Sequence, residues 1–398
     1  MSGNRTSGLF QLMEKTMKPE RLLSLDVMRG MTIAAMILVN NPAVWGKAYA
    51  PLQHAFWHGM TPTDLIYPFF VFIMGVSAFF SLSKRYEGAD RKAFSRILRR
   101  SAVIFGVGLL LQEISYFGYG TANFLSGQTP AGATWFETVF PFRTFRIMGV
   151  LQGLALVYLF GSGALLCLRF RHLIAAAGGL LLLYLVLLQT GNGYSLSADN
   201  IIAVVDRAVL GESHLYKEWL PDGSRLAFEP EGLLSTLPRI AQFLLGCAAG
   251  RILLAKEETP MRFGRLFAFG TMLLFAGLLL QYGDPLNKKI WSSSFALATS
   301  GFASLLLGLL CWVIDLRKQV RWTGFFRVFG VNPLFLYVAA WVLSVTLGVL
   351  SIKSWFYTTL IDPLFGDASG SLVYSLCFIL LVWSLGLVLY RRKIYIKI

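Results

Sequence analysis

Charged residues are scarce in this chain of 398 residues: 14% are Asp, Glu, Lys or Arg, whereas 56% are hydrophobic. A water-soluble domain carries about a quarter charged residues, so the composition excludes an ordinary soluble globular protein. Cysteine is also rare, and Cys167, Cys247, Cys311 and Cys377 all lie in apolar runs without a short CxxC spacing. The sequence therefore supports neither a disulfide framework nor a cysteine metal site.

Long hydrophobic runs dominate the sequence instead. Two of them, 173–188 and 372–390, contain no charged residue, and each approaches the roughly 20 residues that cross a bilayer as a helix. Continuous runs favour helices over a membrane barrel, whose strands alternate polar and apolar residues. We therefore predict an all-α fold, a polytopic transmembrane helix bundle of about ten spans. The predicted spans are 22–42, 62–83, 96–113, 141–166, 171–190, 233–255, 264–281, 290–314, 326–350 and 371–391.

Basic residues give the chain a formal net charge of +15 at pH 7, but they cluster at alternate ends of the apolar runs. This is the positive-inside pattern of a membrane protein rather than a basic face for nucleic acid. Most Lys and Arg residues fall on one side, which predicts that both termini lie in the cytoplasm, with 1–20 as a tail. We expect one transmembrane domain over 1–398, surrounded by membrane lipid and without a cleavable signal peptide.

One long connection, 191–233, is predicted to lie on the non-cytoplasmic side and is too short for a separate domain. It contains Asn200 and is comparatively acidic. Its carboxylates could meet a cationic or hydroxyl-rich ligand, and a solvated loop explains them equally well. The acidic residues are Asp199, Asp206, Glu212, Glu218, Asp222, Glu229 and Glu231.

The most polar stretch beside a predicted span is 40–64, which joins the outer ends of the first two spans. It contains His54 and His58, two of the four histidines in the chain. Imidazole has an ordinary pKa of about 6.5, so it exchanges protons near neutral pH, as group transfer to an amine requires. The two histidines have the spacing of a metal pair, but Ala55 stands where the zinc-protease motif needs Glu. No metal site is predicted.

Structural roles are available for the other polar residues of this stretch. Thr61, Pro62 and Asp64 form a helix-start pattern, in which Thr61 is the N-cap and Asp64 closes a capping box. Asn40 and Asn41 stand before a proline where the first span would end, and they suit a C-terminal cap. The residues alone leave the structural and catalytic interpretations open.

Several short motifs then occur in a fixed order along the chain. They are SLDVMRG (24–30), LVNNP (38–42), HAFWHG (54–59), TDLIYPFFVFIMG (63–75), FRIMGVLQ (145–152), PLNKKIW (285–291) and GVNPLFLY (330–337). Together they resemble the heparan-α-glucosaminide N-acetyltransferase family, and within it the bacterial branch found with N-acetylglucosamine-utilisation genes. The resemblance runs from about Arg21 to the C-terminus and is most specific in its N-terminal part.

The resemblance implies transfer of an acetyl group from cytoplasmic acetyl-CoA to the amine of glucosamine or a small glucosaminide outside a bacterial inner membrane. It is compatible with a homodimer. It assigns catalysis to His54, Asn40 and Asp64. We assign acceptor binding to Asn41, His58, Asn200, Lys288 and Trp291, and acetyl-CoA binding to Arg146, Gln152 and Asn332.

We interpret His54 as the general base for the acceptor amine, Asn40 as the stabiliser of the thioester oxyanion, and Asp64 as a residue that orients His54 or binds the sugar. A covalent acetyl-histidine at His54 is the rival mechanism. Two other functions stay open, an O-acetyltransferase of cell-surface glycans and a sugar or anion transporter. A transporter would place its polar residues near the bilayer midplane, whereas here they lie at the outer face.

Overall fold

The computed structural model describes residues 22–82 and 91–396, so the predicted N-terminal tail 1–20 lies outside the described residues. Within these ranges the only strands are β1 (Lys217–Trp219) and β2 (Arg225–Ala227), which pair antiparallel, and the predicted all-α bundle is confirmed. Eight described helical segments are long and apolar enough to cross a membrane. They are α2 (Leu23–Asn40), η2 with α3 (Pro62–Leu82), α4 (Arg91–Leu125), α6 (Val150–Cys167), α7 (Phe170–Thr190), α10 (Thr259–Leu280), α11 with its π-helical extension (Ser293–Leu316) and α16 (Asp367–Arg391).

The centre of the bundle is a tight contact between α3 and α9 (Thr236–Leu253). Nearly every residue of α9 is buried. A methyl group at Gly75 would stand 2.0 Å from the Phe243 carbonyl oxygen, and one at Gly246 would stand 2.2 Å from the Phe72 carbonyl oxygen. Small residues allow such close approach between membrane helices, whose association depends on van der Waals packing. This contact fixes α3, whose N-terminal end borders the site described below.

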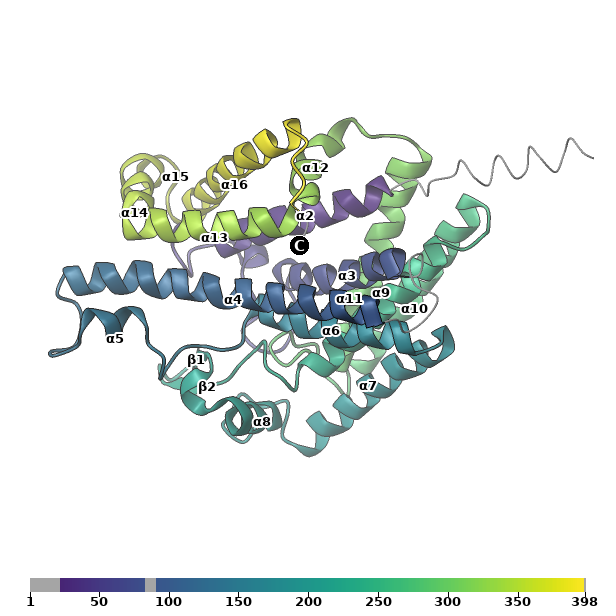
Figure 1. Cartoon of the computed structure of the whole chain (residues 1–398), viewed down its shortest axis with the longest axis horizontal. Coiled ribbons are helices and arrows are strands. Elements are labelled where there is room, and N and C mark those ends of the chain that lie inside the picture. The colour runs from purple at the N-terminus through teal and green to yellow at the C-terminus, as the bar shows by residue number, and fades with distance from the viewer. Residues whose placement is uncertain (1–21, 83–90, 397–398) are drawn as a thin grey trace, which may run out of the picture.

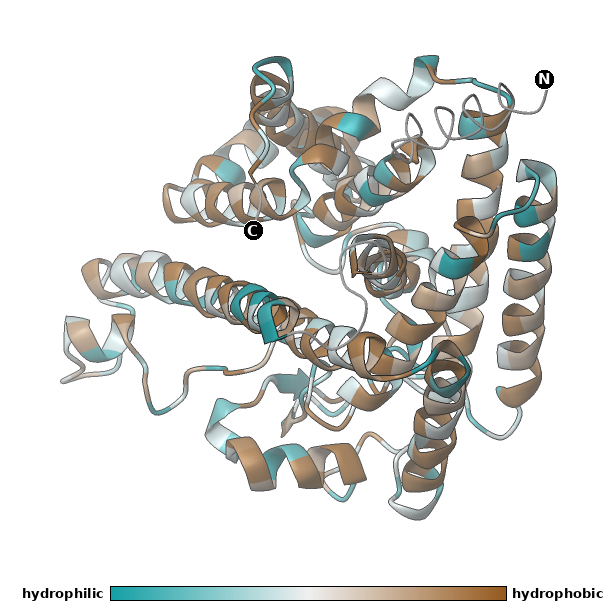
Figure 2. Cartoon of the chain, turned by 45° about the vertical axis from the view of Figure 1, so that its right-hand side comes forward, coloured by the Kyte–Doolittle hydropathy of each residue, from teal (hydrophilic) through white to brown (hydrophobic). Residues whose placement is uncertain are grey.

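Two groups of helices lie on either side of this centre, as Figure 1 shows. One group contains α2, α12 (Gly324–Val331), α13 (Pro333–Val349) and α16, and the other contains α4, α6 and α7. Hydrophobic residues cover most of the helices, whereas hydrophilic residues gather in the connecting segments and at helix ends (Figure 2). This is the distribution expected where lipid surrounds the helices.

Four of the predicted spans differ from the helices that form. The predicted span 96–113 is too short, because α4 continues to Leu125. The predicted span 233–255 corresponds to α9, whose sequence is less apolar because it carries Arg239 and Arg251. The predicted span 326–350 is broken, because α12 and α13 are bent by 76° where Pro333 begins a new helix. The predicted span 141–166 begins late, since α6 starts at Val150. By length and composition the described residues give eight spans, or nine with the bent pair, against ten predicted.

The predicted loop 191–233 is folded rather than open. It contains α8 (Ile201–Leu210) and the β1–β2 hairpin, and it packs around a small core in which Ile202 and Phe228 are fully buried against Tyr184 of α7. The cytoplasmic placement of the termini stays a prediction. The remaining short elements are α5 (Trp135–Val139), α14 (Ile352–Phe356), α15 (Asp362–Phe365), η1 (Ala50–Leu52), η3 (Glu212–His214), η5 (Arg321–Thr323) and the π-helical turn η6 (Tyr357–Ile361).

Candidate active site

A cavity of about 820 Å³ opens where the segment 41–64 meets α2, α4 and α13. Its lining brings together residues from distant parts of the sequence. Polar and charged groups from the predicted outer connections form one side, and the other side is largely aromatic and apolar. The lining includes Asn40, Asn41, His54, Asp64, Tyr67, Arg146, Tyr216, Glu218, Glu231, Lys288, Lys289, Tyr337, Trp341 and Lys353.

Asp64 holds His54 through a short hydrogen bond at the floor of this cavity. The Asp64 Oδ1 atom lies 2.6 Å from His54 Nδ1. The Asp64 Oδ2 atom accepts from the Ala55 and Thr61 amides at 3.1 Å and 3.0 Å. The predicted capping box between Thr61 and Asp64 is present at the start of η2 (Pro62–Leu65). Asp64 therefore has the predicted structural role, and one of its oxygens also contacts the histidine.

This contact determines which nitrogen of His54 can act as a base. A carboxylate accepts hydrogen bonds only, so the proton lies on Nδ1 and the lone pair lies on Nε2. The Asp64 side chain is fully buried, whereas that of His54 is 43% exposed towards the cavity. The pair therefore presents a basic Nε2 atom to any molecule that enters.

A lysine from the far end of the sequence reaches this nitrogen. Lys288 Nζ lies 3.1 Å from His54 Nε2 and 3.2 Å from His54 Nδ1. These nearly equal distances place Nζ over the imidazole ring and not in line with either nitrogen. Because Nδ1 already donates to Asp64, Nε2 is the atom that a rotation of the flexible lysine side chain would bring Nζ to. Burial lowers the pKa of Lys288 below its ordinary 10.5, although Glu231 and Asp64 oppose this shift.

The loop that carries Lys288 is fixed by buried side chains. Asp284 Oδ2 accepts from the Ser294 amide at 2.7 Å, and Tyr194 donates to Asp284 Oδ1 at 2.7 Å. Asn287 Oδ1 accepts from the Lys289 amide at 2.8 Å, next to Lys288 in the chain. Burial raises the pKa of Asp284. These bonds hold the Lys288 backbone in place, so only its side chain is free to move.

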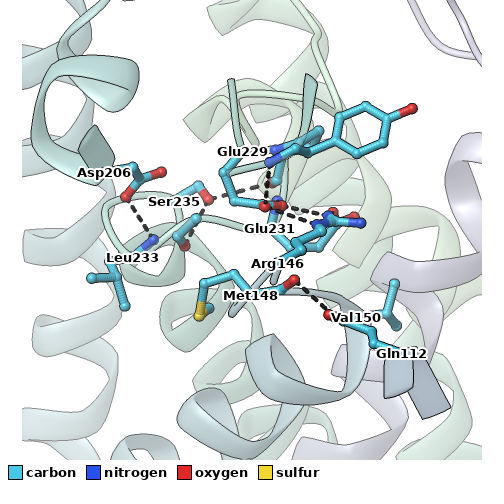
Figure 3. Close-up of polar contacts among 12 residues, drawn as sticks. Gln112, Arg146, Met148, Val150, Asp206, Glu229, Glu231, Leu233 and Ser235 are labelled. Atoms are coloured by element: carbon cyan, nitrogen blue, oxygen red, sulfur yellow. Dashed lines mark hydrogen bonds and ion pairs between the residues drawn. The ribbon is translucent and has the colours of Figure 1, made fainter. Parts of the chain in front are cut away.

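A second charged cluster lies in the wall of the cavity, at Arg146 (Figure 3). Arg146 donates to Glu229 from Nε at 2.9 Å and from Nη2 at 2.5 Å, and Nη2 also reaches Glu231 at 2.9 Å. Burial alone would lower the pKa of Arg146, but the two carboxylates outweigh it and raise the pKa. Burial raises the pKa of Glu231, and Arg146, Lys288 and Arg239 reverse this, so the pKa lies below its ordinary value.

Replacement of Glu229 by Gln is expected to destabilise the protein. Glu229 is fully buried, so the change leaves Arg146 without its two-point charged partner. Removal of one member of a buried ion pair costs about 3–5 kcal/mol when the other charge is left alone. Arg146 keeps its pair with Glu231 and is 26% exposed, so a smaller loss of about 1–3 kcal/mol is expected. A thermal melt in detergent measures the loss.

Glu212→Gln is the matched control for this melt. The Glu212 side chain is 70% exposed and lies 3.9 Å from Lys217, and an exposed pair of this kind contributes about 0–1 kcal/mol. Equal melting temperatures for the two variants would contradict a stabilising role for the Arg146 cluster.

Asp206 of α8 is hydrogen-bonded to the loop that carries Glu229 and Glu231. Its Oδ1 atom accepts from the Leu233 amide at 2.9 Å, and Figure 3 shows this contact beside the Arg146 cluster. Asp206 is fully buried, and its Oδ2 atom has no hydrogen-bond partner among the described residues. Burial raises the pKa of Asp206 to about 7, so the loop is held by a carboxyl group that gains its charge near neutral pH.

The stability of the protein is therefore expected to fall as the pH rises through Asp206. Its pKa is 3.8 in the unfolded reference and about 7 in the fold, so the folded state holds a proton that the unfolded chain has lost. The stabilising effect of that proton is complete below pH 3.8 and lost above about pH 7. The Tm of Asp206→Asn should rise relative to wild type between about pH 4 and about pH 7 and stay level above that. Parallel curves for the two proteins would contradict this assignment.

The predicted catalytic asparagine and its neighbour differ in their surroundings. Asn40 has an exposed side chain that lines the cavity. Asn41 is buried and donates to the Ile37 carbonyl oxygen at 2.8 Å, which is a contact of the helix end. Both residues line the cavity, but the amide nitrogen of Asn41 is already bonded, whereas the Asn40 side chain makes no hydrogen bond among the described residues.

Three of the residues assigned to acceptor binding lie outside the cavity lining. His58 Nδ1 lies 3.5 Å from Asn287 Nδ2, and burial lowers the pKa of His58. Trp291 is buried below the cavity and donates to Gln242 at 3.0 Å. Asn200 caps α8, where its amide donates to Gly193 and Ser195 and accepts from Ile202.

Two of the residues assigned to acetyl-CoA also lie outside this lining. Gln152 is buried beside Gly108 and Gly149, with its Nε2 atom unpartnered among the described residues. Asn332 lies at the bend between α12 and α13, where it bonds both Ile394 and Ile396 at 2.9 Å. Arg146, the third, lines the cavity.

Several other residues line the cavity that the sequence analysis did not assign to the site. Tyr67 follows Asp64 by one helical turn inside a quoted motif, but no pattern separates it from the apolar residues around it. Tyr337 comes from the other side of the bend in the α12–α13 pair. Glu218 and Glu231 belong to the acidic loop, and the structure selects these two from its seven carboxylates. No group of three or more His, Cys, Asp or Glu in the described ranges could hold a metal ion.

Fold and site together define a polytopic membrane protein with a carboxylate–histidine pair in a polar cavity. The family model described as heparan-alpha-glucosaminide N-acetyltransferase, catalytic, matches residues 21–282. The chain is 30% identical to the human heparan-alpha-glucosaminide N-acetyltransferase over 373 residues, which cover 80% of this chain and 52% of the human protein. It is 28% identical to the mouse protein of the same name over 364 residues, which cover 81% and 54% of the two chains.

The chain belongs to the heparan-alpha-glucosaminide N-acetyltransferase family, as its motifs predict, and this is a family of acyltransferases. It spans about half the length of the curated relatives that it matches. The matched range contains His54, Asp64, Arg146 and Glu231, whereas Lys288 follows its last residue. The bacterial branch stays a prediction.

Proposed function

We propose that this protein transfers an acetyl group from acetyl-CoA to the amine of glucosamine or a small glucosaminide, with donor and acceptor on opposite sides of the membrane. The observation that carries the proposal is the Asp64–His54 pair, which exposes Nε2 to a cavity of about 820 Å³. The family relationship supplies the acetyl transfer. The amino-sugar acceptor follows the names of the relatives, and the bacterial inner membrane follows the motifs.

The acceptor amine enters the proposed reaction in its neutral form. An ammonium has no lone pair, so the amine attacks the thioester carbonyl only in its neutral form. His54 Nε2 accepts the proton that leaves nitrogen during this attack, and Asp64 stabilises the imidazolium through Nδ1. The C–S bond then breaks, and the imidazolium returns the proton to the thiolate. The acetyl-histidine route uses the same Nε2 atom as a nucleophile.

Other lining residues have roles that follow from their chemistry. The amide of Asn40 can donate to the carbonyl oxygen as it becomes negative. Glu231 and Glu218 offer carboxylate oxygens to sugar hydroxyls, since both line the same cavity. Tyr67 and Tyr337 add aromatic faces. These assignments place the acceptor beside Lys288, with its amine towards His54.

A second cavity supports entry of the donor from the opposite end of α2. It has a volume of about 480 Å³, and cationic side chains in its wall suit the phosphates of acetyl-CoA. Asp26 lines this cavity and Ile37 lines the first, so the two lie roughly 16 Å apart along α2 at 1.5 Å per residue. The described lining consists of Leu23, Asp26, Arg327, Val331, Tyr390, Arg391, Lys393 and Tyr395.

The test is an acetyl-transfer assay with purified protein in detergent, labelled acetyl-CoA and glucosamine. We expect labelled N-acetylglucosamine, whose amide survives mild alkali. A labelled product that mild alkali hydrolyses would instead identify an ester and an O-acetyltransferase. Intact acetyl-CoA with glucosamine and with hydroxyl acceptors, from folded protein, would contradict the transferase proposal and favour the transporter.

A further inference from the structure

Lys288 holds a primary amine beside the position where the acceptor amine has to be. A nucleophile that gives its proton to His54 must lie within hydrogen-bond distance of Nε2. Lys288 Nζ lies 3.1 Å from this atom, on a side chain that enters the cavity from a fixed loop. A rotation of this side chain therefore brings an amine of the protein itself to its own base.

The neighbouring lysine has different surroundings. Lys289 Nζ lies 3.0 Å from Glu218 Oε1 and 5.3 Å from the centroid of the Phe56 ring. Its ammonium is therefore held by a carboxylate and by the face of an aromatic ring. Lys288 has no carboxylate within ion-pair distance among the described residues, and its nearest polar partner is the imidazole of His54.

We propose that Lys288 is an acetylation site of the protein itself, modified by the acyl thioester when the donor is bound and no acceptor is present. This proposal rests on the proposed function, because it uses the same donor and the same base. The low pKa of Lys288 agrees with it, since a lysine that loses its charge more readily is a better nucleophile.

The reaction is the acceptor reaction with a different amine. The Lys288 ammonium gives one proton through His54 Nε2 to solvent and attacks the thioester carbonyl as the neutral amine. A C–N bond forms and the C–S bond breaks. The second proton passes from nitrogen through Nε2 to the departing thiolate. The products are Nζ-acetyl-Lys288, the free thiol and one released proton.

Acetylation of Lys288 would block the site and inactivate the protein. The amide nitrogen has no available lone pair, so it cannot pass the acetyl group on to a sugar. The added group occupies the space in front of His54 Nε2, and the cation of Lys288 is lost. A bound acceptor competes for the same position and prevents the modification. The protein would therefore lose activity when donor is abundant and acceptor is absent.

The experiment incubates purified protein with acetyl-CoA alone, measures acetylation of Lys288 and Lys289 by mass spectrometry, and assays glucosamine acetylation in the same samples. General-base assistance is worth about 100-fold, so Lys288 should be acetylated about 100-fold faster than Lys289. Preincubation should cause a matching loss of activity, which glucosamine prevents. In His54→Gln, acetylation of Lys288 should fall to the level of Lys289.

Lys288→Arg gives a second measurement, in which each protein is compared with its own initial rate. Preincubation with acetyl-CoA should inactivate the wild type but leave the remaining activity of the variant constant. Acetylated glucosamine with Lys288 unmodified, or with Lys288 and Lys289 modified equally, would overturn this inference and leave the proposed function standing. Neither acetylated glucosamine nor acetyl-Lys288 from folded protein would overturn both.

Discussion

Replacement of His54 by Gln is expected to lower the rate of acetyl transfer by about 10²–10⁴-fold, the usual contribution of a general base. Gln keeps an amide near Asp64, so the short contact at the cavity floor can persist while the proton acceptor is lost. The loss should appear in kcat as well as in kcat/KM, because the base acts in the transition state. Steady-state kinetics with glucosamine and acetyl-CoA measure it.

His172→Gln is the matched control for this substitution. His172 is an exposed residue near the start of α7, away from the cavity lining. The control should keep the wild-type rate and the wild-type melting temperature. A His54→Gln protein with an unchanged rate would contradict the role of His54 in catalysis.

Replacement of Asp64 by Asn is expected to be nearly as damaging, with a loss of about 10³–10⁴-fold. Asp64 Oδ2 accepts two backbone amides and the Thr61 hydroxyl, so the single oxygen of Asn would stay on that side. The Asn amide would then donate to His54 Nδ1 and force the proton onto Nε2. A histidine in this tautomer has no lone pair for the acceptor amine, and the same substitution beside a catalytic histidine costs about 10⁴-fold in serine proteases.

Thermal stability separates this effect from misfolding. The Asn oxygen continues to accept from the Ala55 and Thr61 amides, so the capping of η2 should survive and Tm should change little. NMR of the imidazole nitrogens should show the proton on Nε2 in Asp64→Asn and on Nδ1 in the wild type. A protein with full activity and the proton still on Nδ1 would rule out this account of Asp64.

The contact between Asp64 and His54 is the part of the site that the sequence predicted best. The two residues are ten positions apart, and the helix-start pattern at Thr61–Asp64 already turns the carboxylate back towards the preceding segment. The position of Asp64 therefore follows from local rules of helix capping. His54 was selected from the family motifs.

Lys288 and the Arg146 cluster depend on contacts that no local pattern contains. Lys288 lies 234 positions from His54, and Arg146 lies 83 positions from Glu229. The seven carboxylates of the acidic loop look alike in the sequence, and only the folding of α8 and the β1–β2 hairpin brings Glu231 to the cavity. Their roles become visible through the tertiary structure.

The predicted span boundaries were wrong where the hydrophobicity of a segment did not reflect a membrane-spanning helix. The segment before α6 is rich in aromatic residues that stack on one another, such as Phe140 and Phe142 with centroids 6.1 Å apart, so it resembles a span without being helical throughout. The helix α9 shows the opposite case. Arg239 is fully buried inside the protein, and Arg251 is exposed near the end of the helix, so both lower the hydropathy of a helix that forms nonetheless. At Asn332–Pro333 the sequence contains the proline that breaks the helix. The apolar residues on either side nevertheless led to the prediction of one continuous span.

Transfer across a sealed membrane tests the central claim most directly. Purified protein is reconstituted in liposomes that contain glucosamine, and labelled acetyl-CoA is added outside, with His54→Gln liposomes in parallel. We predict labelled N-acetylglucosamine inside the wild-type liposomes while the acetyl-CoA stays outside, and none with the variant. Labelled acetyl-CoA inside the liposomes, or product only when donor and acceptor share one side, would contradict transmembrane acetyl transfer at His54.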